Sequence, residues 1–512
     1  MLMLQRVLLL SILLLMFNGD SSPAWSETGS EPTTWTGQLD AAFGAVVGAL
    51  VFVFFADFGT GVPLVVAILL GGGIYYSFYF RWMPIRGFRH AIDVVRGRYD
   101  SPDDPGEISH FQALSSALSA TIGLGNIAGV AIAVSLGGPG AVFWMLITAV
   151  FGMSSKLASC TLAVMYRRIN PDGHVSGGPM YYLQHGLSAK GPAWGILGRI
   201  LAILFAILTI GGSLGGGNMF QANQTIEILS TVSPLFRDYN WVVGLIMAAF
   251  VALVIIGGIR RIGHVTSRIV PFMCLLYLLT SALIVLSHAS LIPEMIAKIL
   301  SDAFTGPALY GGFVGVLVMG VRRASFSNEA GLGSAAFAHA AARTDEPARE
   351  GMVAMLGPFI DTIIVCMMTA MVCMITGVYA DPEFQASQGF LVGSKMTAAA
   401  FESFIPGARY VLAVAVLLFA YSTMISWSYY GERAWEYLFG VGSTIIYRIM
   451  FVCFVFIGAI TALSNILDFS DMMILGMAFP NIIGGVILSP RIKECLNEYW
   501  GRYKRGEMER TG

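Results

Sequence analysis

Long apolar runs recur along this chain and restrict the folds it can adopt. Between residues 63 and 490 there are eleven of them, separated by shorter polar or basic segments: 63–80, 111–133, 139–165, 193–217, 240–258, 265–287, 309–335, 352–378, 409–428, 445–462 and 466–490. As a helix, each run can cross the ~30 Å hydrocarbon core of a bilayer. Charged residues make up 12% of the chain, against roughly 25% in an average soluble domain. We therefore predict an all-α polytopic membrane protein with 11 transmembrane helices.

The segment before the first apolar run has two parts. Arg6 precedes a short apolar run, and a small-x-small sequence follows at residues 24–26. This order is typical of a signal peptide, and the run is shorter than the ~20 residues that span a bilayer. We expect residues 1–26 to be a signal peptide; an uncleaved anchor helix is the alternative. Residues 27–62 would then be a periplasmic segment, with Leu39–Phe55 as an amphipathic helix at the outer interface.

Basic residues gather on alternate loops. The loops after the first and every later odd-numbered run hold most of them: Arg81, Arg86, Arg89, Arg96, Arg98, Arg167, Arg168, Arg260, Arg261, Arg268, Arg343, Arg349 and Arg433. The intervening loops hold little: Arg237, Lys298 and Lys395. Because Lys and Arg mark cytoplasmic loops, the mature N-terminus is predicted to be periplasmic and the basic tail, 491–512, cytoplasmic. This predicts a multi-pass protein of a bacterial inner membrane. The net charge of −1 argues against nucleic-acid binding.

The runs after the first one divide into two halves. Ten runs remain, which form two sets of five at about 108–287 and 309–490, and an odd number of spans gives the sets opposite orientations. The first run of each set is interrupted by glycines, at Thr121–Asn126 and at Glu329–Ser334. A helix break frees backbone N–H groups for a carboxylate and carbonyls for a cation. Paired breaks in an inverted repeat therefore predict a binding site near the membrane midplane. Glycine for close helix packing is the alternative.

Five sequence blocks resemble one family of transporters. They are SATIGLGNIAGV at 119–130, GGPGAVFWM at 137–145, GNMFQANQ at 217–224, FSNEAGLGSAAFAHAAA at 326–342 and FAYSTMISWSYYGE at 419–432. In these blocks and their order the chain resembles the alanine or glycine:cation symporter family. The resemblance implies the ten-helix inverted repeat of the bacterial leucine transporter, with one extra helix in front, over a transporter domain at 63–490. It also implies a sodium-coupled secondary symporter that imports a small neutral amino acid, alanine or glycine, by alternating access.

The resemblance also assigns residues to the site. It implies that the substrate is bound by Leu124, Gly125, Asn126, Gln221, Phe326, Gly331, Met424 and Trp427. It implies that sodium is bound by the carbonyls of Ser119 and Ile122 and the hydroxyls of Ser422 and Thr423. The expected partners are the amino acid, sodium as the coupling ion and membrane lipid, with no other cofactor, no nucleic acid and no obligatory protein partner.

The chain departs from the family pattern at three positions. Leu124 stands where threonine is common, Ser159 where glutamate is usual and Met367 where threonine is common. These departures leave the exact substrate and the ion ratio open.

Ionisable side chains also occur inside the apolar runs, and such residues are functional candidates by default. They are Lys156, Arg322, Glu329, Asp361 and Asp471. Lys156 could pair with Asp361. His339 is expected to be a structural histidine rather than a proton relay.

Other function classes would need other residues. A proton-coupled transporter of another small solute would favour an acid or lysine in place of the hydroxyls at the cation site. A membrane enzyme would need a catalytic set near one interface, such as HExxH or a Ser-His-Asp arrangement. HExxH does not occur, and the seven histidines are scattered along the chain. A channel would need a selectivity filter or charged rings, which nothing in the sequence suggests. We therefore expect a transporter and not an enzyme.

Overall fold

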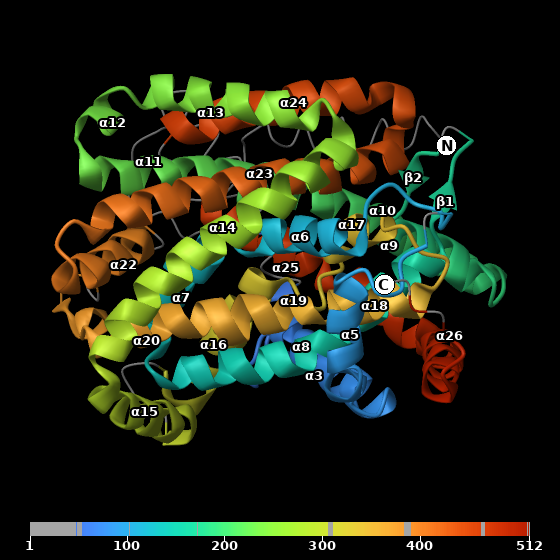
Figure 1. Cartoon of the computed structure of the whole chain (residues 1–512), viewed down its shortest axis with the longest axis horizontal. Helices are drawn as coiled ribbons and strands as arrows, with labels where there is room; N and C mark the ends of the chain where they lie inside the picture. The colour runs from blue at the N-terminus through green and yellow to red at the C-terminus, as the bar shows by residue number, and fades with distance from the viewer. Residues whose placement is uncertain are drawn as a thin grey trace.

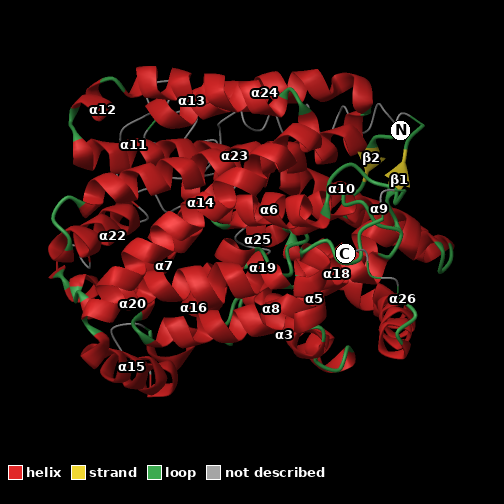
Figure 2. Cartoon of the chain, viewed as in Figure 1, coloured by secondary structure: helices red, strands yellow, loops and turns green. Residues whose placement is uncertain are grey.

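A computed structural model describes residues 48, 54–101, 103–171, 173–305, 311–382, 384, 391–461, 466–508 and 510. The expected signal peptide and almost all of the expected amphipathic helix Leu39–Phe55 lie outside these residues. Nearly everything described is helical (Figure 2), as the apolar runs predict.

The first half of the chain contains these helices: α3 (Leu64–Tyr79), α4 (Met83–Arg86), α5 (Phe88–Val95), α6 (His110–Thr121), η1 (Gly125–Gly129), α7 (Val130–Gly137), α8 (Gly140–Met165), α9 (Pro179–Tyr181), η2 (Tyr182–Gly186), α10 (Pro192–Leu214), η3 (Gly215–Met219), α11 (Phe220–Val232), α12 (Leu235–Asp238), α13 (Asn240–Ile255) and α14 (Gly258–Ser287). Between α8 and α9 the strands β1 (Arg168–Ile169) and β2 (Val175–Ser176) form a short antiparallel hairpin.

The second half contains η4 (Ala289–Leu291), α15 (Ile292–Thr305), α16 (Gly312–Asn328), α17 (Ala335–Ala340), α18 (Pro347–Ala354), α19 (Leu356–Pro358), η6 (Phe359–Cys366), α20 (Met367–Ile375), η7 (Val378–Ala380), α22 (Leu391–Phe404), α23 (Ala408–Phe439), η8 (Val441–Ser443), α24 (Thr444–Ile460), α25 (Ile466–Gly476) and α26 (Ala478–Arg505). Figure 1 shows α11, α13, α23 and α24 on one side of the bundle, α3, α8 and α16 on the other, and α14 crossing in front.

Several helices are long and apolar enough to span a membrane. Within the described ranges there are seven, or eight if α6 and α7 are counted as one bent span. The shorter apolar helices α3 and α13 also coincide with predicted runs. The chain is thus a multi-pass membrane protein, whereas the number of eleven spans and the inverted repeat stay predictions.

The ends of some elements differ from the apolar runs. The predicted run 466–490 contains two helices, α25 and α26. The second of these continues to Arg505, so most of the expected basic tail is helical. Helices α15 and α22 lie between the predicted runs. Each has 14 residues, fewer than the ~20 that span a bilayer.

Both expected helix breaks are present. Helices α6 and α7 meet at 55°, with the break at Ile122–Leu124. The break between α16 and α17 includes Glu329, Gly331 and Gly333, whose φ angles are 54°, 86° and 90°. Residues other than glycine rarely adopt this left-handed region, so the two glycines permit the turn that ends α16.

Backbone hydrogen bonds join the start of the first broken helix to the end of the second. The amide N–H groups of Glu107 and Ile108, which precede α6, donate to the carbonyl of Ala341 after α17, at 2.8 and 3.2 Å. Arg167 ties the same region together, because its guanidinium donates to the carbonyls of Ala340 and Ala342 at 2.7 and 2.6 Å. The start of α6 and the end of α17 therefore lie side by side.

Candidate functional site

The end of α6 is joined to the middle of α23 by two reciprocal hydrogen bonds. The Thr423 hydroxyl donates to the Ser119 carbonyl at 3.0 Å, and the Ser119 hydroxyl donates to the Ser422 carbonyl at 2.6 Å. All three residues are buried. Three of the four residues expected to bind sodium are thus brought together, and Ile122 follows Ser119 at the break. The Ser422 hydroxyl differs, because it donates back to the Phe419 carbonyl at 3.0 Å, as serines in helices often do.

The first break approaches Thr423 closely at Gly123. A Cβ atom on Gly123 would lie 2.7 Å from the Thr423 Oγ1 atom, so the site has no room for a side chain there. The same Cβ would lie 3.6 Å from the Gln221 Oε1 atom, which places the α11 glutamine at the break as well.

Gln221 presents an unused acceptor. Its Nε2 donates to the Gly216 carbonyl at 2.9 Å, while no donor among the described residues reaches its buried Oε1 atom. Leaving a buried polar atom unpaired costs about 1–3 kcal/mol. A buried acceptor without a donor beside a helix break is suited to bind a donor on a ligand, such as an ammonium group.

Asn126 braces the break from within. Its Oδ1 accepts from the Gly123 amide at 3.0 Å, and its Nδ2 donates to the Asp361 Oδ1 at 2.6 Å. These bonds use both ends of the side-chain amide. The structure therefore places Asn126, an expected substrate contact, as a support for the backbone that carries Leu124 and Gly125.

Asp361 connects the two broken helices. Besides the bond from Asn126, its Oδ2 accepts from the Ser327 hydroxyl at 3.0 Å and the Thr362 hydroxyl at 2.7 Å. Ser327 is near the end of α16, so one carboxylate links both breaks through η6. Sequence reasoning singled out Asp361 but missed Ser327 and Thr362; the position of Ser327 beside Phe326 in the family block was the available signal.

The aromatic residues expected in the pocket wall lie around these groups. A Cβ on Gly125 would be 3.4 Å from the Phe326 ring, which in turn meets Phe220 edge-on with ring centroids 6.3 Å apart. Trp427 donates from Nε1 to the Glu329 Oε1 at 3.1 Å, which joins α23 to the second break. Leu124 and Met424 are fully buried.

Gly331 lies elsewhere. A Cβ there would be 2.9 Å from Leu69 on α3 and 3.4 Å from Ile482 on α26, and its carbonyl accepts from the Asn481 Nδ2 at 2.7 Å. Gly331 thus shapes the second break and packs it against α3 and α26, away from the neighbours of Gly123. Its positive φ accounts for the glycine without a substrate contact.

The other charges within the apolar runs fall into two kinds. Arg322 and Arg323 both donate to Asp471 Oδ2, at 2.6 and 2.9 Å, in an ion cluster between α16 and α25. The buried Lys156 interacts electrostatically with Glu329 and Asp361. Within the described ranges, Lys156 is not hydrogen-bonded to Asp361, so the direct pair considered from the sequence does not form.

His339 and Ser159 have local partners. His339 Nδ1 is 2.5 Å from Glu350 Oε1, and His110 contacts the other oxygen of the same carboxylate. Ser159 donates back to the Ser155 carbonyl at 2.9 Å, so it has the bonding of an ordinary helical serine. In the described part of the chain no three His, Cys, Asp or Glu side chains form a group that could hold a metal ion.

Comparison with known proteins identifies the family. The model of the sodium:alanine symporter family matches residues 48–511. The chain belongs to the sodium:alanine symporter family. It is 42% identical over 431 residues to the sodium/alanine symporter AgcS of Methanococcus maripaludis, covering 83% of this chain and 92% of AgcS. It is 32% identical over 447 residues to the probable sodium/glutamine symporter GlnT of Bacillus subtilis, covering 87% and 89%.

The fold agrees with this assignment. The crystal structure of MhsT in complex with L-phenylalanine superposes with a TM-score of 0.52, covering 74% of this chain and 89% of MhsT at 12% identity. At that identity the likeness concerns the fold alone. Membership of the family makes this chain a cation-coupled amino-acid symporter.

Proposed function

We propose that this symporter imports a small neutral amino acid, alanine or glycine, together with sodium, by alternating access through eleven spans built on a five-plus-five inverted repeat. The observation that carries the proposal is the meeting of Thr423 Oγ1 with the Ser119 carbonyl at a helix break. The name of AgcS, which includes sodium and alanine, supports the same choice of ion and substrate.

The cation part rests on oxygen chemistry. Sodium is a hard ion that prefers oxygen ligands, and carbonyls freed by a helix break supply them without a fixed charge. The carbonyls of Ser119 and Ile122 and the Thr423 hydroxyl are proposed as ligands. The Ser422 hydroxyl, which donates back to Phe419, is the weakest member of the proposed set.

The substrate part rests on the neighbouring groups. The backbone N–H groups of Leu124 and Gly125 stand at the start of a half-helix, where a carboxylate is favoured. The free acceptor of Gln221 suits the ammonium group. Phe326, Met424 and Trp427 would close the pocket around a short side chain, and Leu124 adds bulk where the family often has threonine.

A proton is the second candidate for the coupling ion. The observation that favours it is the buried Asp361, which lies one hydrogen bond from the break through Asn126 and interacts electrostatically with Lys156. A carboxylate in this position could carry a proton instead of a structural charge.

Uptake by the full chain in proteoliposomes tests the proposal. Labelled alanine and glycine should accumulate under an inward sodium gradient, and leucine or phenylalanine should not compete. Thr423→Val keeps the side-chain shape and removes one oxygen. It should raise the sodium concentration for half-maximal uptake tenfold or more, which corresponds to about 1.4 kcal/mol.

A matched control is Thr209→Val, because Thr209 is equally buried on α10 and only bonds back to Phe205 at 2.8 Å. It should leave the sodium dependence unchanged. If Thr423→Val and Ser422→Ala both behave like this control, the proposed cation site is wrong. Uptake that follows a pH gradient and does not depend on sodium would show that the coupling ion is the proton.

A further inference from the structure

An apolar groove lies on the outer face of the bundle, beside the first broken helix. Its volume is about 350 Å³, and its walls come from α5, α6, α14, α19 and η6. The lining is almost entirely apolar and includes Ile92, Phe111, Leu114, Leu118, Pro271 and Ile360. Since a water molecule occupies ~30 Å³, the groove has room for a segment of hydrocarbon chain.

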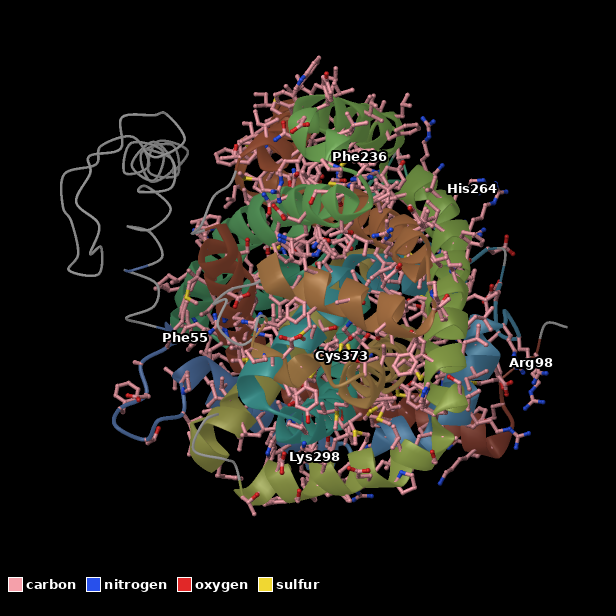
Figure 3. The ribbon with its side chains drawn as sticks, turned by 90° about the vertical axis from the view of Figure 1, so that its left-hand side faces the viewer. Phe55, Arg98, Phe236, His264, Lys298 and Cys373 are labelled. Atoms are coloured by element: carbon pink, nitrogen blue, oxygen red, sulfur yellow. The ribbon has the colours of Figure 1, made fainter. Side chains whose placement is uncertain are left out.

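The groove opens toward lipid. Phe111 is 41% exposed, and the neighbouring residues Phe272, Leu275 and Leu279 of α14 are 57–59% exposed. Exposed apolar side chains along a membrane-spanning helix face hydrocarbon. Figure 1 shows α14 in front of the bundle with α6 beside it, and the two helices are in contact. In Figure 3, His264 near the start of α14 and Arg98 just after α5 lie along one edge of the molecule.

One cationic side chain lines the groove. Arg96 follows the last residue of α5, and within the described residues no carboxylate forms an ion pair with it. Arg98, two residues further on, contrasts with it, since it pairs with Asp93 at 2.8 Å. Arg96 belongs to the first basic loop, which the charge asymmetry places on the cytoplasmic side. A basic residue between helices on that side suits an anionic lipid head group.

From this combination we propose that the groove is a binding site for one acyl chain of an anionic phospholipid of the inner leaflet, with its phosphate at Arg96. The apolar walls take the chain, and the guanidinium, which has three nitrogen atoms bearing hydrogens, can donate to phosphate oxygens.

The site also adjoins the proposed cation site. Leu118 of the groove precedes Ser119, whose carbonyl meets Thr423. On α14, Val270 and Cys274 line the groove, and Met273 between them is 3.5 Å from the Ser422 hydroxyl. A bound lipid would therefore pack against α6, which carries Ser119, and against α14, whose Met273 contacts Ser422. Lipid binding itself does not depend on the proposed ion or substrate.

Photo-crosslinking tests the lipid site directly. The full-length protein is placed in phosphatidylcholine nanodiscs with a trace of phosphatidylglycerol or phosphatidylcholine that carries a diazirine in its acyl chain. Crosslinked peptides are then quantified by mass spectrometry. We expect phosphatidylglycerol to label the segments Phe111–Leu118 and Val270–Cys274 more strongly than phosphatidylcholine does. Exposed positions on α24, such as Ile445 and Ile449, should show no such preference.

Variants identify the head-group contact. Arg96→Gln should lower the preference for phosphatidylglycerol in the groove about fivefold, which corresponds to about 1 kcal/mol. Arg96→Lys should retain most of it. Arg89→Gln is the matched control, because Arg89 is an exposed arginine of α5 outside the groove lining, and it should have no effect.

Cys274→Trp fills the groove and should reduce labelling of both segments with either lipid. Equal labelling by the two lipids in the wild-type protein, or an Arg96→Gln result equal to that of Arg89→Gln, would overturn the proposal. The readout does not involve transport, so failure here leaves the proposed function standing, and the reverse also holds.

Discussion

Asp361 and Asp471 show how single residues are accommodated deep in the membrane domain. Asp361 accepts hydrogen bonds from Asn126, Ser327 and Thr362, and Asp471 accepts from two arginines. A charged side chain in hydrocarbon is costly unless it is paired and hydrogen-bonded. The sequence identifies such residues by their contrast with the apolar run around them. It does not identify their partners, which with the exception of Thr362 come from other helices.

His90 provides a test at the residue scale, outside the membrane-spanning segments. It lies on α5, is 1% exposed, and its Nε2 is 2.7 Å from the Tyr499 hydroxyl. Burial, aided by the charge of Arg349, lowers the pKa of His90 from 6.5 to about 4. Because the unfolded chain binds this proton more readily, the contribution of His90 to the free energy of unfolding should fall as the pH drops from 6.5 toward 4 and be constant above 6.5.

The measurement is thermal unfolding of the detergent-solubilised protein between pH 4 and pH 8. His90→Gln can keep a hydrogen bond to Tyr499 but cannot take up the proton. The variant should therefore lose less stability between pH 6.5 and pH 4 than the wild-type protein does. Identical pH profiles for the two proteins would show that His90 is not responsible.

At the scale of elements, the two broken helices organise the site. Glycine at a break can serve two purposes, which sequence alone does not separate. Gly123 leaves room for Thr423, whereas Gly331 and Gly333 adopt backbone angles that other residues avoid. Both positions were predicted as part of a break. Only the packing shows that Gly123 faces Thr423 and Gln221 while Gly331 faces α3 and α26.

Gly123→Ala tests this distinction. The new Cβ would lie 2.7 Å from the Thr423 Oγ1, so the break or α23 must shift. Alanine uptake should fall at least tenfold, because the proposed ion ligands move apart. The variant should still reach the membrane. Uptake by proteoliposomes with matched protein content is the measurement.

Gly129→Ala is the control for this change. Gly129 lies at the end of η1 in the same broken helix, and a Cβ there meets nothing within 4 Å. This variant should transport like the wild-type protein. Equal uptake by both variants would mean that the contact between Gly123 and Thr423 has no role in transport.

At the scale of the whole molecule, the strongest expectation from sequence is orientation. The basic loops predict a periplasmic mature N-terminus and a cytoplasmic C-terminus. The long helix α26 runs from the apolar domain into the basic segment and ends at Arg505, with Arg502, Lys504 and Arg505 in its last turn. Cations at a helix C-terminus interact favourably with the helix dipole, so these side chains stabilise the end of α26.

Reporter fusions check the orientation. A fluorescent protein that folds only in the cytoplasm should be active after Gly512. A phosphatase that is active only in the periplasm should be active when it is joined after Asp238, at the end of α12 in a predicted periplasmic loop. The opposite pattern at Gly512 would refute the predicted topology.

The sequence by itself determined the helical membrane fold, the two glycine breaks and the residue types at the site. These features depend on local properties: the length of the apolar runs, the glycines that interrupt two of them, and the adjacent hydroxyl residues Ser422 and Thr423. The tertiary structure decided which of those residues meet. Thr423 and Ser119 are 304 positions apart, and their bond exists only because α6 and α23 pack together. Helix packing likewise decides that Asn126 bonds to Asp361, that Gly331 contacts α3 and α26, and that Ser327 bonds to Asp361. Contacts between helices depend on side-chain geometry that no local pattern specifies.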